Sequence, residues 1–335
     1  MYLNNQAPMT VSQNNNHQLQ TELGTFVEKP TDWLETALKE PREEGFIESD
    51  GCKIHYFRWG KPSNPPLVLL HGFLSHARCF AFIAPFLAKD FHIVAYDFSG
   101  MGDSGVREQY SDATRVTELL ETVDKTGLFD HQHKPIIISH SYGGRIALEA
   151  ITQHPDKFAG LIVCDLMIIR PEILIANKEQ FQAPGNQDPN RPNRIYPDLE
   201  SAKKRFVLAP PQKVEEPQLF NYMAYHSLKE VDGGCTWKFD PSVYNTSADD
   251  LEKWTRFGKL LVAAPGNKAV VYGAESLLFN ADSADYVREI GGFDFPIIEI
   301  ANARHHLMLD QPIAFVSVLK TILSTWAVNN GFSEK

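Results

Sequence analysis

Residues 135–145 have the sequence PIIISHSYGGR, and this stretch decides the fold. Its short, bounded apolar run is typical of a fully buried strand. The residues that follow, from Arg145 to His154, are typical of a helix with one apolar face, made of Ile146, Ala147, Ala150 and Ile151. Ser141 therefore lies at a sharp turn between a strand and a helix.

A serine at such a turn is typical of a reactive nucleophile. The turn is strained, so the residues two before and two after the serine must be small, and here they are Ser139 and Gly143. The helix behind Ser141 directs N–H groups and the positive end of its dipole toward the reacting oxygen. The usual pattern is G-x-S-x-G, and Ser139 replaces the first glycine. A serine in an ordinary glycine-rich turn is the alternative interpretation.

Length, composition and charge exclude several classes of protein. The chain has 335 residues, of which 43% are hydrophobic, and this suits one large or two modest domains. Its net charge of −10 argues against a nucleic-acid or anionic-membrane partner. No apolar run approaches the ~20 residues of a membrane span. Residues 1–20 are rich in Asn and Gln and lack the pattern of a signal peptide, so we expect residues 1–30 to be a disordered extension.

The cysteines show no paired spacing of the kind found in zinc sites or disulfide frameworks. We expect them to be free, buried thiols in a reducing, cytoplasmic compartment; they are Cys52, Cys79, Cys164 and Cys235. Apart from one glycine-rich stretch discussed below, no pattern indicates a cofactor or a metal, and we expect neither.

Alternating strands and helices predict an α/β fold with a doubly wound, mostly parallel sheet. Strands are expected at residues 45–49, 53–59, 67–70, 92–96, 135–138, 161–164, 269–273 and 297–300, and helices at residues 81–88, 114–126, 145–154, 283–290 and 312–326. Residues 167–257, here called the insertion, break the alternation and show helical patches without a convincing buried strand. We expect the insertion to form a helical cap on a core made of residues 44–166 and 258–335.

Chemically suggestive residues follow the predicted strands directly. In doubly wound sheets, ligands bind at the carboxyl ends of the strands, where these residues would meet. They are His71, Gly72, Phe73, Asp97, Ser141, Asp165 and the loop after Ile300.

Residues 100–105, GMGDSG, match the G-x-G-x-x-G pattern of dinucleotide-binding loops. Such a loop opens a helix directly, normally after the first strand. Here several predicted strands come first and the next helix starts later. We therefore expect a tight loop beside the site, and nucleotide binding is disfavoured.

A serine hydroxyl needs a base to become a good nucleophile. His305 and His306 follow the last predicted strand, and only one imidazole can lie within ~3 Å of the serine oxygen. His305 lies seven residues before Pro312.

Over residues 44–327 the chain resembles the α/β-hydrolase superfamily. The resemblance rests on four features in the family's order: His71-Gly72-Phe73 after the third strand, D-x-x-G-x-G-x-S at residues 97–104, the serine turn, and a histidine seven residues before a proline.

The resemblance implies a role for each site residue. Ser141 is the expected nucleophile and His305 the expected base, with His306 as the rival base or a wall residue. The backbone N–H groups of Phe73 and Tyr142 are expected to form the oxyanion hole. Gly72 gives the chain room to turn there, and His71 is expected to hold this loop more than to act on substrate.

The acid of the triad has two candidates. Many family members carry Asp three residues after the glycine that ends the seventh strand, and this chain has Ser276 there. Asp165 ends the preceding strand, where some members place their acid, and Glu275 is one residue from the usual position. We favour Asp165, because its strand end adjoins the strand of the serine.

These features predict a cofactor-independent serine hydrolase that acts on a small to medium, partly apolar ester or related acyl substrate. The insertion would line the substrate pocket, and the expected lining residues are His71, Gly72, Phe206, His226, Trp237 and His306. Two alternatives remain: a hydrolase that cleaves a C–C bond next to a ketone, and a catalytically silent protein that retains a ligand.

Overall fold

The computed structural model describes residues 30–176, 190–245 and 251–330. Within them, the main sheet has eight strands in the order β1-β2-β4-β3-β5-β6-β9-β10. β2 is antiparallel to β1 and β4, and the other neighbours are parallel. The predicted α/β, mostly parallel architecture is therefore confirmed. The strands are β1 Glu43–Ser49, β2 Cys52–Trp59, β3 Pro66–Leu70, β4 His92–Tyr96, β5 Ile136–His140, β6 Gly160–Cys164, β9 Asn267–Gly273 and β10 Ile297–Ile300.

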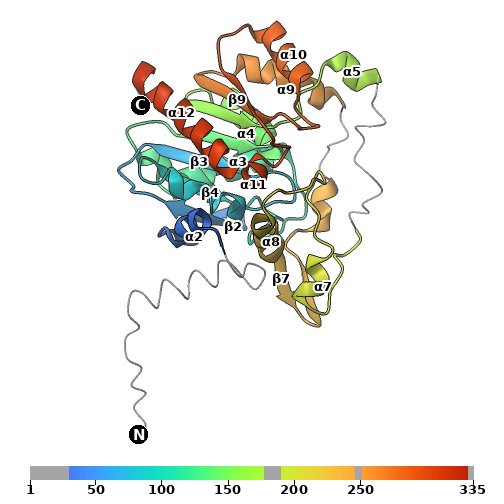
Figure 1. Cartoon of the computed structure of the whole chain (residues 1–335). Helices are drawn as coiled ribbons and strands as arrows, with labels where there is room; N and C mark the ends of the chain where they lie inside the picture. The colour runs from blue at the N-terminus through green and yellow to red at the C-terminus, as the bar shows by residue number, and fades with distance from the viewer. Residues whose placement is uncertain (1–29, 177–189, 246–250, 331–335) are drawn as a thin grey trace.

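Helices cover both faces of the sheet, as Figure 1 shows. In β3, Leu67 and Leu69 enter one apolar cluster and Val68 and Leu70 the other, because successive side chains of a strand point to opposite faces. The first cluster also includes residues of α2 (Asp32–Lys39) and α12 (Pro312–Asn330). The second includes residues of α3 (Asp112–Lys125), α4 (Tyr142–Gln153), α9 (Leu251–Ala263) and α10 (Ala281–Gly291).

Two local differences from the sequence-based expectations lie beside the first cluster. The prediction of an α-helix at residues 81–88 is wrong: the chain forms two 3₁₀ turns, η1 (Ala77–Phe80) and η2 (Ala84–Phe86). Pro85 lacks an N–H, and the next two N–H groups each bond three residues back, from Phe86 to Ile83 O and from Leu87 to Ala84 O. Helix α2 was not predicted, because eight residues are too few to show a clear period.

The insertion contains a β-hairpin as well as helices. Strands β7 (Leu228–Val231) and β8 (Gly234–Trp237) pair antiparallel around Asp232-Gly233, a turn signal that the expectation of a strand-free insertion overlooked. The other elements are α5 (Pro171–Ala176), α7 (Leu199–Lys203), α8 (Pro217–His226) and η4 (Pro241–Asn245). In Figure 1, α7, α8 and β7 gather at the lower right of the sheet. Helix α9 crosses the predicted boundary at residue 258 and contacts α4 and α10.

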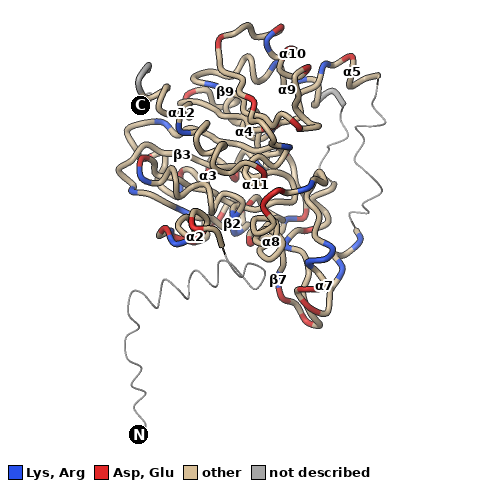
Figure 2. The backbone as a smooth tube through the Cα atoms, viewed as in Figure 1, with Lys and Arg blue, Asp and Glu red and all other residues tan. Residues whose placement is uncertain are grey.

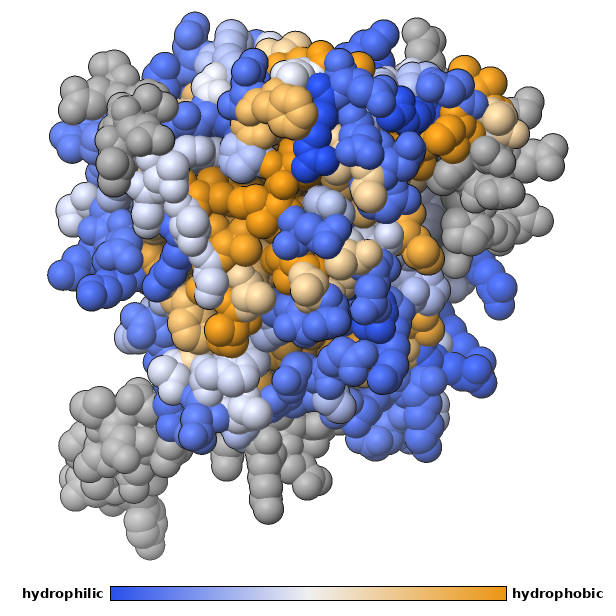
Figure 3. All heavy atoms as spheres, turned by 45° about the horizontal axis from the view of Figure 1, so that its top comes forward, coloured by the Kyte–Doolittle hydropathy of each residue, from blue (hydrophilic) through white to orange (hydrophobic). Residues whose placement is uncertain are grey.

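The surface is mixed in charge and in polarity. Figure 2 shows basic and acidic residues interspersed along the chain, and Figure 3 shows an apolar region bordered by polar residues on one face. Among the helices of the described residues, none is both long and apolar enough to cross a membrane. The four cysteines are free and buried, as predicted. The predicted N-terminal extension lies outside the described residues, except for residue 30.

Candidate active site

Ser141 lies between β5 and α4 with φ 50° and ψ −120°, a conformation that residues with a side chain rarely adopt. Its N–H donates to the carbonyl of Cys164 over 2.9 Å, which ties the turn to β6. A Cβ on Gly143 would lie 2.7 Å from the carbonyl oxygen of Leu70, so this position needs glycine. Ser139 is accommodated because its hydroxyl donates to a β6 carbonyl over 3.2 Å. The neighbouring strands therefore hold the serine in its strained turn.

Asp165 and His305 are joined by a hydrogen bond of 2.8 Å between Oδ1 and Nδ1. Both residues are buried, at 0% and 2% exposure. The carboxylate also accepts the hydroxyl of Ser276 at 2.6 Å and the N–H of Gly273 at 3.0 Å. These donors fix the carboxylate against the imidazole. When Nδ1 carries the proton that is donated to Asp165, Nε2 is the basic nitrogen.

Glu275, the alternative acid, lies elsewhere. Its carboxylate is 47% exposed and pairs with Arg304, at 2.9 Å between Oε2 and Nη2. Ser276 stands where many relatives would carry the acid, and it donates to Asp165 instead. The structure thus brings His305 together with Asp165 and places Glu275 on Arg304. The supporting contact of Ser276 was not predicted, because a lone serine gives no sequence signal of its partner.

Two further histidine rings surround His305. The ring centroids of His140 and His306 lie 4.7 and 4.9 Å from that of His305. His140 Nε2 donates to the carbonyl of His305 over 2.8 Å, which brings the loop of His305 beside the residue that precedes Ser141. His140 was not predicted as a site residue, although it adjoins the serine.

The neighbouring histidines stay neutral. Burial lowers the pKa of His140 to about 3, and the charge of His305 acts in the same direction. Burial also lowers the pKa of His306 well below its ordinary value. The Nε2 of His305 is buried and has no hydrogen-bond partner among the described residues. The Nε2 of His306 is likewise buried without a partner, so the contact that distinguishes His305 is the carboxylate of Asp165, which orients its ring.

The loop after β3 lies directly against the serine. A Cβ on Gly72 would lie 3.3 Å from the Cβ of Ser141, which explains the glycine. The ring of Phe73 lies 5.6 Å from that of Tyr142 and 5.5 Å from that of Tyr244 in η4. Tyr142 is the first residue of α4, so its N–H has no carbonyl acceptor within the helix. Tyr244 was not predicted, because nothing in its local sequence marks it.

His71 supports the loop after β3 through hydrogen bonds of its ring. Its Nδ1 donates to the carbonyl of Gly72 over 2.7 Å, and its Nε2 accepts the N–H of Phe98 over 3.1 Å. The side chain is fully buried, and burial lowers the pKa of His71 to about 4. Both ring nitrogens are engaged, as expected for a residue that holds this loop. That His71 lines the substrate pocket stays a prediction.

The predicted pocket residues of the insertion contact one another and other insertion residues. The ring of Phe206 lies 5.1 Å from Phe220 and 6.1 Å from Trp237. His226 is buried, and its ring lies 4.4 Å from that of Tyr222. These contacts build the apolar interior of the insertion. A direct contact of Phe206, His226 or Trp237 with substrate stays a prediction.

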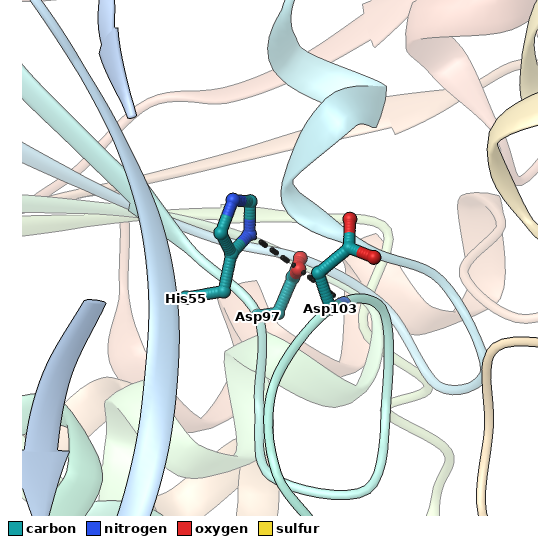
Figure 4. A group of neighbouring side chains, drawn as sticks. All are labelled: His55, Asp97 and Asp103. Carbon is teal, nitrogen blue, oxygen red and sulfur yellow. Dashed lines mark hydrogen bonds and ion pairs between the residues drawn. The ribbon is translucent and has the colours of Figure 1, made fainter. Parts of the chain in front are cut away.

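A second polar cluster lies outside this site (Figure 4). His55 lies between two carboxylates, 2.8 Å from Asp97 and 2.9 Å from Glu44. Burial acts to lower the pKa of His55, but the hydrogen bonds to the two carboxylates outweigh it and raise this pKa to about 9. His55 and Asp97 therefore form a buried ion pair that joins β2 to the loop after β4, and Glu44 contacts the other ring nitrogen from the surface.

The same cluster has the residue types of a metal site. Ligand atoms of His55, Asp97 and Asp103 lie within 4.8 Å of one another. However, Asp97 also accepts the N–H groups of Ala77 and Asp103, at 2.6 and 2.8 Å, so protein donors already surround its carboxylate. Asp103 itself pairs with Lys238 of the insertion at 2.6 Å. We therefore interpret the cluster as a structural anchor.

The glycine-rich stretch folds as the tight loop that the sequence predicts. The N–H of Gly100 donates to the carbonyl of Gly105 over 2.6 Å, and Gly102 has φ 59° directly over the carboxylate of Asp97. The next helix, α3, begins only at Asp112. The glycines thus close a loop around Asp97 and do not open a helix.

Residues 67–318 match the model of the alpha/beta hydrolase family, and the chain belongs to this family. The uncharacterized hydrolase YugF of Bacillus subtilis (strain 168) is 29% identical over 116 residues, which cover 34% of this chain and 41% of that protein. The serine hydrolase-like protein of Danio rerio is 26% identical over 201 residues, 54% of this chain and 57% of that protein. These matches span about half of each relative's length.

Solved structures show the same fold. The thioesterase domain from the curacin biosynthetic pathway superposes with a TM-score of 0.67 at 22% identity, covering 85% of this chain and 100% of that domain.

Proposed function

We propose that the chain is a cofactor-independent serine hydrolase that cleaves a small to medium, partly apolar ester or related acyl substrate. The observation that carries the proposal is the buried 2.8 Å hydrogen bond between His305 and Asp165, on a histidine whose other nitrogen is unengaged. The strained turn of Ser141 lies beside the loop of this histidine, because His140 bonds to it. A nucleophile, a base and an orienting acid are the three parts that acyl transfer requires.

In the first half-reaction, the Oγ of Ser141 attacks the acyl carbonyl carbon and its proton passes to Nε2 of His305. Asp165 stabilises the imidazolium that forms. The oxyanion of the tetrahedral intermediate accepts hydrogen bonds from the N–H groups of Phe73 and Tyr142, supported by the dipole of α4. His305 then gives its proton to the leaving group, and the acyl ester of Ser141 remains.

In the second half-reaction, water attacks this acyl ester. His305 takes a proton from the water and returns it to the oxygen of Ser141 as the acid product leaves. Atoms and charges balance over the cycle, so no cofactor is required.

The surroundings of the serine favour an uncharged, partly apolar acyl group. The nearby histidines His140 and His306 are held neutral by burial, and the adjoining rings of Phe73, Tyr142 and Tyr244 are aromatic. An ionised acyl group would lose its hydration here without gaining an opposite charge from these residues.

Hydrolysis of p-nitrophenyl esters of increasing acyl length tests the proposal. The wild type should turn over, and Ser141→Ala should lower kcat by at least about 10³-fold, as loss of a triad nucleophile does. Ser139→Ala is the matched control, since its hydroxyl bonds only to a backbone carbonyl, and its kcat should stay within about threefold. Wild-type rates in Ser141→Ala would contradict the proposal.

A further inference from the structure

The loop that carries His305 is bonded to the insertion as well as to the core. Gln212 of the insertion makes two hydrogen bonds here. Its Oε1 accepts the N–H of His306 over 3.0 Å, and its Nε2 donates to Asp310 Oδ2 over 3.0 Å. Gln212 of the insertion therefore contacts both the residue after His305 and the carboxylate of Asp310.

The partner of Gln212 on the core side is a buried carboxylate. Asp310 is 3% exposed, and its Oδ2 also accepts the N–H of Arg304 over 2.7 Å. The guanidinium of Arg304 lies 3.9 Å from this carboxylate, and the charges of Arg304 and Glu215 act on its pKa in opposite directions. Burial raises the pKa of Asp310, whereas the hydrogen bonds that it accepts from Arg304 and Gln212 stabilise its charged form. The hydrogen bonds of Asp310 and Gln212 thus fix the backbone on both sides of His305.

We propose that Gln212 is a positioning residue for His305, through which the insertion holds the base in register with Ser141. This inference rests on the proposed function, in which His305 is the base. An amide is the side chain that the position requires, because it presents one acceptor to His306 and one donor to Asp310. The placement of the insertion and the orientation of the base are therefore coupled.

The variants Gln212→Ala and Gln212→Glu separate this role from general packing. Alanine removes both bonds. Glutamate keeps the shape and the acceptor, but it sets a second carboxylate against Asp310, a contact that is tolerated only when the two share a proton. Gln218→Ala is the matched control, because Gln218 is a second glutamine of the insertion and makes two bonds to Thr31, far from the histidine loop in the sequence.

The kinetic readout is kcat and KM of ester hydrolysis against pH. Gln212→Ala should lower kcat about tenfold with KM within about twofold, since the geometry of proton transfer changes and substrate contacts do not. The kcat of Gln212→Glu relative to wild type should rise as the pH falls. Gln218→Ala should keep wild-type kcat. Wild-type kcat in Gln212→Ala, or equal losses in Gln212→Ala and Gln218→Ala, would overturn the inference.

A second readout does not depend on turnover. The proton in the hydrogen bond between His305 Nδ1 and Asp165 should give a low-field NMR resonance in the wild type and in Gln218→Ala, and it should be broadened or lost in Gln212→Ala. A resonance that is unchanged in Gln212→Ala would overturn the positioning role. If the wild type hydrolyses no ester but the resonance responds as expected, the proposed function fails and the positioning role stands.

Discussion

Replacing Asp165 by asparagine tests the acid of the site in detail. The native carboxylate accepts hydrogen bonds from His305, Ser276 and Gly273. Asparagine has one acceptor oxygen and one NH₂ group, so it cannot satisfy all three donors. When its NH₂ group faces Nδ1 of His305, that nitrogen must accept, and the ring proton moves to Nε2. This nitrogen can then no longer take the proton of Ser141.

The expected magnitude follows from this change of tautomer. Loss of a triad acid with the geometry preserved lowers kcat by about 10⁴-fold, or about 5 kcal/mol in the activation barrier. Glu275→Gln is the matched control. Glu275 is 47% exposed and makes a surface ion pair with Arg304. Such pairs are worth at most about 1 kcal/mol, so kcat should change by less than about threefold.

The assay is kcat for p-nitrophenyl butyrate, with thermal melting to show that each variant folds. The reasoning is refuted if Asp165→Asn keeps more than about a tenth of the wild-type kcat, because a wrong tautomer cannot support that rate. A loss of several orders of magnitude in Glu275→Gln would assign the acid to Glu275 instead.

Three further changes probe the packing around the site. Ser276→Ala removes a 2.6 Å hydrogen bond to Asp165 and should lower kcat about tenfold. An unchanged kcat in steady-state assays would contradict a supporting role of Ser276. Gly143→Ala brings a Cβ within 2.7 Å of the carbonyl of Leu70 and should cost about 1–3 kcal/mol in urea unfolding, whereas wild-type stability would contradict the close approach. Folding raises the pKa of His55 from 6.5 to about 9, so the proton binds the folded state more tightly. Protonated His55 therefore adds up to about 3 kcal/mol to the free energy of unfolding. This stabilisation is complete below pH 6.5 and is lost as the pH rises through 9. Urea unfolding should show this decline in the wild type and a flatter profile in His55→Gln.

The fold could be predicted because its central strands are continuous apolar runs. β3, β4, β5 and β6 are covered on both faces and are buried along their whole length, so their sequences stand out without any alternation. Once the strands are parallel, the residues that follow them must meet at one edge, and this placed Ser141 and Asp165 close together.

The choice between the two acids depended on contacts that a sequence does not show. Glu275 has the reach to approach a histidine, but Arg304 binds it at the surface. Asp165 is directed inward because Gly273 and Ser276, more than a hundred residues later, donate to it. Long-range hydrogen bonds of this kind leave no local pattern.

The insertion was the least predictable part. Its elements are short, and its aromatic residues pack by tertiary contact, so Tyr244 gave no signal of its approach to Phe73. Gln212 was missed for the same reason, since its partners lie about a hundred residues further along the chain.

Covalent labelling by a fluorophosphonate, followed by mass spectrometry of the digested protein, tests the central claim most directly. An activated serine reacts stoichiometrically with this probe, and a serine without a base does not. We expect one adduct per chain, on the peptide that contains Ser141, and no adduct in Ser141→Ala. An unlabelled wild type, or an adduct on another residue, would contradict the assignment of Ser141 as the nucleophile.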